Sequence, residues 1–315
     1  MSRPWWSAVL GLTLFLAGTS LALSRIGLVI HELVGHGGTA IAVGGTVTDA
    51  HLFWFAGGWI RYAVAEPSVA KELAISLGGI AVETVLGIAL WVGLGRRTGL
   101  GGRTLRTLGA ALGVHAMFYL ATGTWHGYGD GRLIHALAGD ARYPLAIAAG
   151  AVGCAAGWSG ARHLFGSLVA AVPASGSSRG ARLAGVLIAI AAAAAVNVAL
   201  DLGELRVRRD AVYQVTMQPE RERVVARELA EWQRAQPAEV PDAELAARAR
   251  ALAAQHRDFP FAWLLGVSLT AAIVAGAARA RRGTEHRLAP RLIAVACGAA
   301  VISTAAVIAI DAGFH

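Results

Sequence analysis

Two histidines and a glutamate lie close together early in the chain, in the segment His31-Glu32-Leu33-Val34-Gly35-His36. Imidazole nitrogens are common zinc ligands, and a neighbouring carboxylate can accept the proton of a water molecule that the metal activates. The pattern is therefore typical of a helical zinc-hydrolase motif, in which His31 and His36 would bind the metal and Glu32 would be the general base. Ionisable groups are costly inside an apolar segment such as residues 26–43, which favours a functional role.

The spacing of the two histidines is one residue longer than in the usual motif, because three residues separate Glu32 from His36. On an ideal α-helix, side chains five positions apart point about 140° away from each other, whereas four positions leave about 40°. A π-helical turn absorbs one extra residue and would bring the imidazoles together, and Gly35 tolerates such a turn best. The sequence thus predicts a metal site only if this helix is locally widened.

A zinc hydrolase also needs a third protein ligand and an open position for water. The strongest candidate is Asp130, which follows an apolar run and is flanked by glycines that permit close backbone approach. Glu83 is the alternative, because a carboxylate in the middle of an apolar run is costly unless it is paired or metal-bound. His126 would orient Asp130 or the transition state, or cap its helix, whereas His115 and Asn197 are expected to hydrogen-bond between helices.

The composition of the whole chain is that of a membrane protein. It is 56% hydrophobic and 15% charged, with a mean hydropathy of +0.54. We predict an all-α, multi-pass (polytopic) membrane protein with about seven or eight transmembrane helices, and we expect it in a bacterial inner (cytoplasmic) membrane. The apolar runs that would form these helices cover residues 6–23, 26–43, 73–94, 105–125, 145–172, 183–202, 261–280 and 292–310.

Basic residues give the chain a net charge of +8, but they are spread over the connections between apolar runs. This distribution is typical of the positive-inside rule and not of a nucleic-acid-binding groove. The expected partners are therefore the lipid bilayer and a membrane protein or peptide, and no nucleic acid. The clusters lie at Arg96, Arg97, Arg103 and Arg106, at Arg179 and Arg182, and at Arg281, Arg282, Arg287 and Arg291.

Two short stretches after the His-Glu segment favour β-structure. Residues 46–55 and 59–64 are rich in β-branched and aromatic residues and flank a glycine pair, which predicts a β-hairpin. The strand edge could hold an extended peptide by main-chain hydrogen bonds, or the hairpin could be an interfacial anchor. Farther along, the charged segment 204–258 has the composition of helices and is expected to form a water-exposed helical hairpin.

The order of these features resembles that of the site-2-protease-like zinc metallopeptidases, which cleave substrates within or beside the bilayer. This resemblance covers residues 24–140 and implies that Asp130 is the third zinc ligand, although the histidine spacing is longer and Trp125-His126-Gly127 stands where an Asn-Pro element often precedes the aspartate. The lengthened motif itself also looks like that of the soluble dipeptidyl-peptidase III family. The features that match are His31-Glu32 with His36, the glycine-rich hairpin 44–64, the glycine-bearing segment 77–84 and Asp130-Gly131.

The resemblance implies an intramembrane zinc metalloprotease in which zinc-activated water, with Glu32 as general base, hydrolyses peptide bonds of membrane-associated substrates. The alternative is a non-enzymatic membrane protein, such as an inactive protease relative or a transporter, that uses the His/Asp cluster to bind a metal, a partner or ions. A transporter should have two related halves, and the His-Glu segment has no second copy. We expect four regions: a metallopeptidase-like core at 1–140, further membrane helices at 141–203, an extramembrane helical insertion at 204–258, and C-terminal membrane helices at 259–315.

Overall fold

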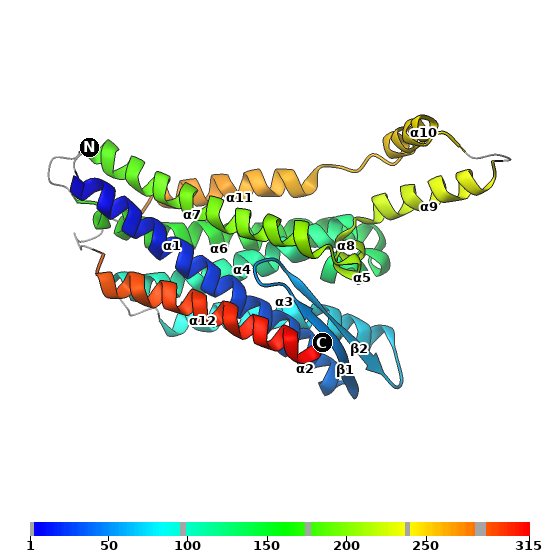
Figure 1. Cartoon of the computed structure of the whole chain (residues 1–315), viewed down its shortest axis with the longest axis horizontal. Helices are drawn as coiled ribbons and strands as arrows, with labels where there is room; N and C mark the ends of the chain where they lie inside the picture. Colours follow the sequence, from blue (N-terminus) through cyan, green and yellow to red (C-terminus); the bar gives the residue numbers. More distant parts are fainter. Residues whose placement is uncertain (1–2, 95–98, 174–177, 237–239, 281–287) are drawn as a thin grey trace.

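The computed structural model describes residues 3–94, 99–173, 178–236, 240–280 and 288–315, and it is an elongated bundle of helices with one small β-hairpin (Figure 1). Six of the described helices are long and apolar enough to cross a membrane, so the prediction of an all-α, multi-pass membrane protein is confirmed. The long helices are α1 (Arg3–Val29), α3 (Val69–Gly93), α4 (Leu100–His126), α6 (Arg142–Ala171), α7 (Arg179–Arg208), α11 (Phe261–Ala278) and α12 (Pro290–Phe314).

The first two apolar runs form one continuous helix instead of two separate segments. α1 continues through the π-helix η1 (Ile30–Gly37) into α2 (Gly38–Ala42), so that 39 residues, Pro4–Ala42, make a single candidate span. Such a helix is roughly 55–60 Å long, well beyond the ~30 Å hydrocarbon core, and must tilt or project from the membrane. The chain between the runs holds no proline or glycine that would break the helix.

α4 completes the bundle, although it is not among the six candidate spans. It packs along both α3 and α6, while α1 packs against α7 and α12, and α11 packs against α6. The outward faces of the bundle carry many exposed leucine, isoleucine and valine side chains, for example Val85, Val92 and Ile302. A surface of this kind is suited to lipid contact.

The predicted hairpin is confirmed as β1 (Gly45–Leu52) and β2 (Gly58–Val64), which pair antiparallel from Gly45↔Val64 to Leu52↔Gly58. Its tip is closed by the backbone N–H of Phe53, which donates to the carbonyl of Gly57 at 3.0 Å. The hairpin packs against η1, α2 and α12, so it lies beside the His-Glu segment.

The charged segment after α7 contains the two predicted helices, α9 (Glu220–Arg234) and α10 (Asp242–Gln255), which project beyond the bundle at the hairpin end (Figure 1). Glu204, where we expect the insertion to begin, is a buried residue of α7, which continues to Arg208. Shorter helices surround this end: η2 (Gly129–Gly131), α5 (Arg132–Leu137), η3 (Gly139–Ala141) and α8 (Ala211–Met217).

Candidate metal centre

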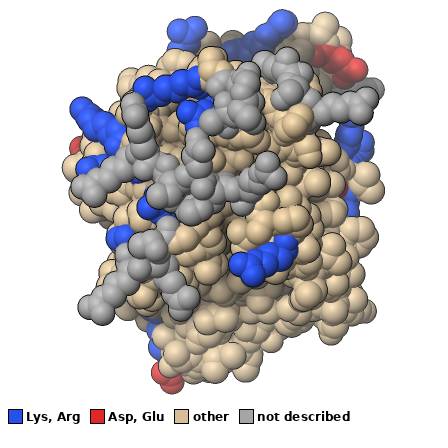
Figure 2. Space-filling view, turned by 90° about the vertical axis from the view of Figure 1, so that its left-hand side faces the viewer, with Lys and Arg blue, Asp and Glu red and all other residues tan. Residues whose placement is uncertain are grey.

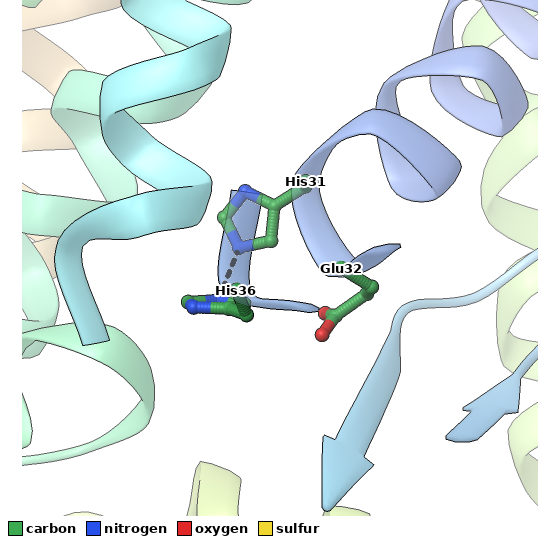
Figure 3. A group of neighbouring side chains, drawn as sticks. All are labelled: His31, Glu32 and His36. Carbon is green, nitrogen blue, oxygen red and sulfur yellow. Dashed lines mark hydrogen bonds between the residues drawn. The ribbon is translucent and has the colours of Figure 1, made fainter. Parts of the chain in front are cut away.

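The His-Glu segment is a π-helix over its whole length, Ile30–Gly37, as its histidine spacing requires. The widened turn places the imidazoles of His31 and His36 next to each other, with their Nε2 atoms 3.2 Å apart (Figure 3). On a regular α-helix these side chains would point in different directions. The prediction that one turn absorbs the extra residue is therefore confirmed.

Close backbone contact with α3 explains why this turn contains Gly35. A Cβ atom on Gly35 would lie 2.5 Å from the Cα of Gly79 and 2.8 Å from the carbonyl oxygen of Gly78. A Cβ atom on Gly79 would lie 2.5 Å from Nε2 of His31. The two helices thus meet backbone to backbone at glycines, and this contact positions the His31 ring over α3.

Asp130 reaches the same point from η2. Its Oδ2 atom lies 3.0 Å from Nε2 of His31, and its Oδ1 atom lies 3.2 Å from Nε2 of His36. Gly127 and Gly129, which precede it, have φ values of 70° and 50°, where glycine is favoured. Ser76 on α3 donates to the backbone carbonyl of Asp130 at 2.8 Å and fixes the loop. The structure therefore brings together all three residues expected to be metal ligands.

The spacing of the two imidazole nitrogens suits a zinc ion. Two atoms bound to tetrahedral zinc at 2.0 Å are about 3.3 Å from each other, and the Nε2 atoms of His31 and His36 lie 3.2 Å apart. Each of these nitrogens has a different oxygen of Asp130 within 3.0–3.2 Å, so the carboxylate faces both. His36 donates from Nδ1 to the carbonyl of Ile75 at 2.6 Å, so in the neutral tautomer its Nε2 carries a lone pair. That lone pair faces the carboxylate of Asp130 and the second imidazole, so either a proton on an imidazole or a metal cation would balance the negative charge at this point.

The surroundings of Asp130 keep its carboxylate ionised. Burial alone would raise the pKa of Asp130, but the nearby imidazoles of His36 and His31 outweigh this effect and hold its pKa below the usual range. The carboxylate is thus kept in the ionised form in which it can bind a metal.

Glu83, the alternative third ligand, lies on the far side of His31. Its Oε2 atom is 3.6 Å from Nδ1 of His31 and 3.0 Å from Nδ1 of His115. A carboxylate on the second nitrogen of a ligating imidazole orients the ring and increases its basicity. Glu83 is therefore placed to support His31 and not to bind the metal directly.

Glu32 lies beside the imidazole pair and not between the rings (Figure 3). It is buried, and one of its oxygens lies within 4.8 Å of the ligand atoms of His31 and His36. Glu32 could therefore also be a ligand by distance, but Asp130 approaches both histidines more closely. This leaves the Glu32 carboxylate available for proton transfer.

A cavity of about 530 Å³ opens next to the site and is lined by both His31 and Glu32. Its volume lies within the range of ligand-binding cavities. Leucine, valine and alanine side chains make part of the wall, and His115 and Tyr119 on α4 add polar groups near His31. The site therefore combines side chains of the kind that bind metals with an adjoining cavity that could hold a ligand.

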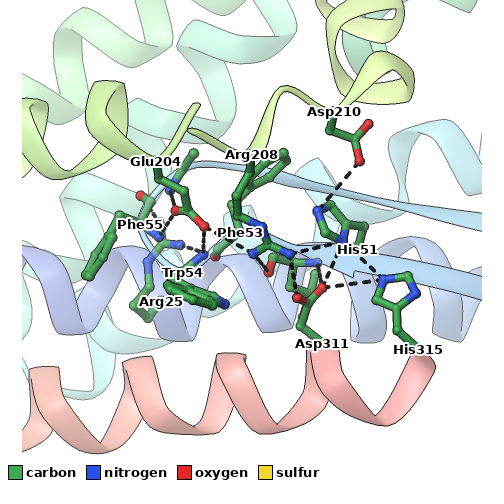
Figure 4. A network of polar contacts seen from close by, with 12 residues as sticks. Arg25, His51, Phe53, Trp54, Phe55, Glu204, Arg208, Asp210, Asp311 and His315 are labelled. Atoms are coloured by element: carbon green, nitrogen blue, oxygen red, sulfur yellow. Dashed lines mark hydrogen bonds and ion pairs between the residues drawn. The ribbon is translucent and has the colours of Figure 1, made fainter. Parts of the chain in front are cut away.

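The hairpin tip forms another wall of this cavity and is held by a buried ion network. Arg25 donates to the carbonyls of Phe53 and Phe55 at 2.8 and 2.6 Å, and Glu204 accepts from the N–H groups of Trp54, Phe55 and Ala56. We call this network, with its neighbours at the strand ends, the hairpin clamp (Figure 4). It comprises Arg25, His51, Glu204, Arg208, Asp311 and His315.

The sequence offered a signal for the clamp that its interpretation overlooked. Arg25 stands between two apolar runs and Glu204 near the end of another, so both are charged residues within membrane helices. Asn197 and His115 do bond between helices, to Ser20 and Glu83 respectively. His126 pairs with Asp258 at the end of the insertion, and not with Asp130.

No family model matches the chain, and no curated protein or solved structure is significantly similar to it. The resemblance to site-2-protease-like peptidases therefore stays a prediction that rests on the residues of the motif. The geometry of the site must support any functional conclusion by itself.

Proposed function

We propose that this protein is a zinc-dependent peptidase that hydrolyses peptide bonds of membrane-associated substrates. One observation carries the proposal: a π-helical turn places Nε2 of His31 and of His36 3.2 Å apart, and the two carboxylate oxygens of Asp130 from η2 lie 3.0 and 3.2 Å from these nitrogens. The proposed location is a bacterial inner membrane, with the arginine-rich end of the bundle in the cytoplasm.

Each residue of the site would have a separate role in hydrolysis. His31, His36 and Asp130 hold the metal, and zinc bound there would supply Lewis-acid chemistry, making a nucleophile from water and polarising a carbonyl. Glu32 takes the proton of the attacking water and returns it to the leaving amine. The negative charge of Glu83, 3.6 Å from Nδ1 of His31, favours a proton on that nitrogen and so leaves Nε2 free for the metal.

Substrate reaches the site through the cavity beside Glu32. Its walls combine apolar side chains with the polar side chains of Arg25, Asn197 and Asp201. Such walls suit a substrate segment that has unwound from the end of an apolar membrane helix. The hairpin tip borders the same space and would contact the peptide next to the scissile bond. Tyr119 lines the same cavity near His31, and its hydroxyl, which donates to the weak acceptor Sδ of Met217 at 3.3 Å, would donate instead to the carbonyl oxygen under attack.

The decisive variant is Glu32→Gln in the full-length protein, purified with its metal and assayed against a transmembrane peptide substrate. Removal of a general base should lower the turnover rate roughly 10²–10⁴-fold while the zinc content stays at that of the wild type. Glu66→Gln, an exposed carboxylate at the end of the hairpin, is the matched control and should retain full activity. Full activity of Glu32→Gln, or a wild-type protein without zinc, would contradict the proposal. Zinc binding without any hydrolysis would instead support the non-enzymatic alternative.

A further inference from the structure

The end of the bundle opposite the hairpin is strongly basic. Figure 2 looks onto this end and shows many lysine or arginine side chains and few acidic ones. The described residues in the helix ends here, 99–107, 158–173, 178–182, 276–280 and 288–293, include no aspartate or glutamate. Five arginines of the expected basic loops lie outside the described residues: Arg96, Arg97, Arg281, Arg282 and Arg287.

A cavity of about 360 Å³ lies at this end between α3, α4 and α6. Among the described residues, no carboxylate lines it. A cavity between membrane helices that is lined by three arginines and a histidine is suited to an anion. Its main lining residues are Trp91 from α3, Arg103 and Arg106 from α4, and Trp158, Arg162 and His163 from α6.

The lining side chains are held in defined positions by stacking. The guanidinium of Arg106 lies 4.3 Å from the ring centre of Trp91, and that of Arg162 lies 5.1 Å from the ring centre of Trp158. Stacking uses the face of a guanidinium, while recognition of a phosphate uses its N–H edge, so the two interactions are compatible. The tryptophan rings therefore preorganise the arginines for a bidentate contact.

His163 gives a second, independent sign of a missing ligand. Its ring meets Trp91 edge to face, and its Nε2 atom is buried without a hydrogen-bond partner among the described residues. A buried imidazole nitrogen without a partner is costly unless a ligand or water satisfies it. An anion seated between the arginines would accept this hydrogen bond.

The depth of the cavity matches the headgroup layer of a bilayer. Arg103 and Arg106 lie within the first two turns of α4, which begins at Leu100, and Trp91 lies near the end of α3 at Gly93. These positions are about 3–9 Å from the helix ends, comparable with the ~5–8 Å of headgroup region on each side of the hydrocarbon core. Tryptophan is itself enriched at this interface.

We propose that this cavity binds the phosphate of an anionic phospholipid headgroup. The acyl chains would lie along the exposed apolar faces of the same helices, while the guanidinium groups and His163 hold the phosphate. The site is separate from the metal centre and does not depend on the proposed function. A free phosphate has the same charged oxygens, but it has no acyl chains and so gains nothing from the apolar helix faces beside the cavity.

Native mass spectrometry of the full-length protein in detergent tests this, with phosphatidylglycerol, phosphatidylcholine and inorganic phosphate as probes. The wild type should hold phosphatidylglycerol roughly tenfold more tightly than phosphatidylcholine. The double variant Arg106→Gln/Arg162→Gln should lose this preference. Arg279→Gln/Arg291→Gln removes the same charge from exposed positions at the same end and should keep it.

Three results would overturn the proposal: equal binding of the two lipids, equal loss in both double variants, or tight binding of inorganic phosphate without a lipid preference. If the glutamine pair does not purify as a folded protein, Arg106→Lys/Arg162→Lys decides instead. Lysine keeps the charge but lacks the planar fork, so it should bind phosphatidylglycerol severalfold more weakly than arginine. Unchanged binding in the lysine pair would then contradict a bidentate phosphate site.

Discussion

Two clusters in this protein have nearly the same spacing of histidine and aspartate but opposite surroundings. In the metal centre, His31 and His36 contact the two oxygens of Asp130 at 3.0 and 3.2 Å. In the hairpin clamp, Nδ1 of His51 lies 3.0 Å from Asp311 and 3.1 Å from Nε2 of His315 (Figure 4). By distance alone, either cluster could hold a metal ion.

The two clusters differ in the groups that contact their aspartates. Oδ1 of Asp311 accepts the backbone N–H of Leu52 at 2.8 Å, and Oδ2 accepts a guanidinium N–H of Arg208 at 2.7 Å. Arg208 thus supplies the positive charge, and a metal would have to displace it. For Asp130, no lysine or arginine among the described residues forms an ion pair. Of the two clusters, the one around Asp130 is therefore the better candidate for a metal site.

The largest expected difference between the clusters is in zinc affinity. His36→Ala removes a ligand and should weaken zinc binding more than about a hundredfold. Even the loss of a residue that only orients a metal ligand lowers metal affinity by 10–100-fold. His51→Ala, its counterpart in the clamp, should leave zinc affinity unchanged. Competition with a chelator of known affinity measures both. Equal losses in the two variants would mean that both clusters bind metal.

A subtler way to disturb the metal centre is to alter the π-turn without touching a ligand. In Gly35→Ala the new methyl group would overlap the backbone of Gly79, so α3 and η1 must separate and the two imidazoles lose their alignment. Zinc affinity should fall by roughly ten- to a hundredfold. The matched control is Gly38→Ala, whose Cβ would come no closer than 3.9 Å to the carbonyl oxygen of Leu33.

Gly38→Ala should keep zinc and gain up to about 1 kcal/mol of stability, because alanine favours helix over glycine. Thermal unfolding and zinc content, measured on both variants, give the comparison. If Gly35→Ala bound zinc as tightly as Gly38→Ala, the close contact with α3 would not position the ligands.

The π-turn is also where sequence reasoning was most informative. The spacing of His31 and His36 predicted a π-helical turn, and residues Ile30–Gly37 form one. The glycines around Asp130 likewise marked a real loop. Such features could be predicted because they depend on residues close together in the chain.

The hairpin clamp could not be predicted in the same way. Arg25, Glu204 and Asp311 lie far apart in sequence and meet only through the packing of α1, α7 and α12. Composition also placed Glu204 in a solvated insertion, since a rise in charge does not show whether a helix has ended. The supporting role of Glu83 was equally hidden, because it depends on how α3 lies against η1.

Glu83 offers a smaller test of the metal centre. Glu83→Gln keeps the shape of the side chain but removes the charge that faces His31 and His115. Zinc affinity should fall by about tenfold, at the low end of the effects expected for residues behind a ligand. Glu72→Gln, on the same helix but bonded to Tyr62, should leave the affinity unchanged. A loss as large as that in His36→Ala would instead identify Glu83 as a ligand.

The smallest change in metal binding is expected from the clamp itself. Asp311→Asn weakens the bond to Arg208, which keeps its ion pair with Glu204 at 3.1 Å. This should cost on the order of 1–3 kcal/mol locally, seen as faster hydrogen exchange at Leu52 and the tip, while zinc affinity stays unchanged. Arg61→Gln breaks an exposed ion pair with Asp49 and should cost at most about 1 kcal/mol. Loss of zinc in Asp311→Asn without a looser hairpin would contradict this comparison. It would mean that the hairpin clamp, and not the cluster of His31, His36 and Asp130, binds the metal.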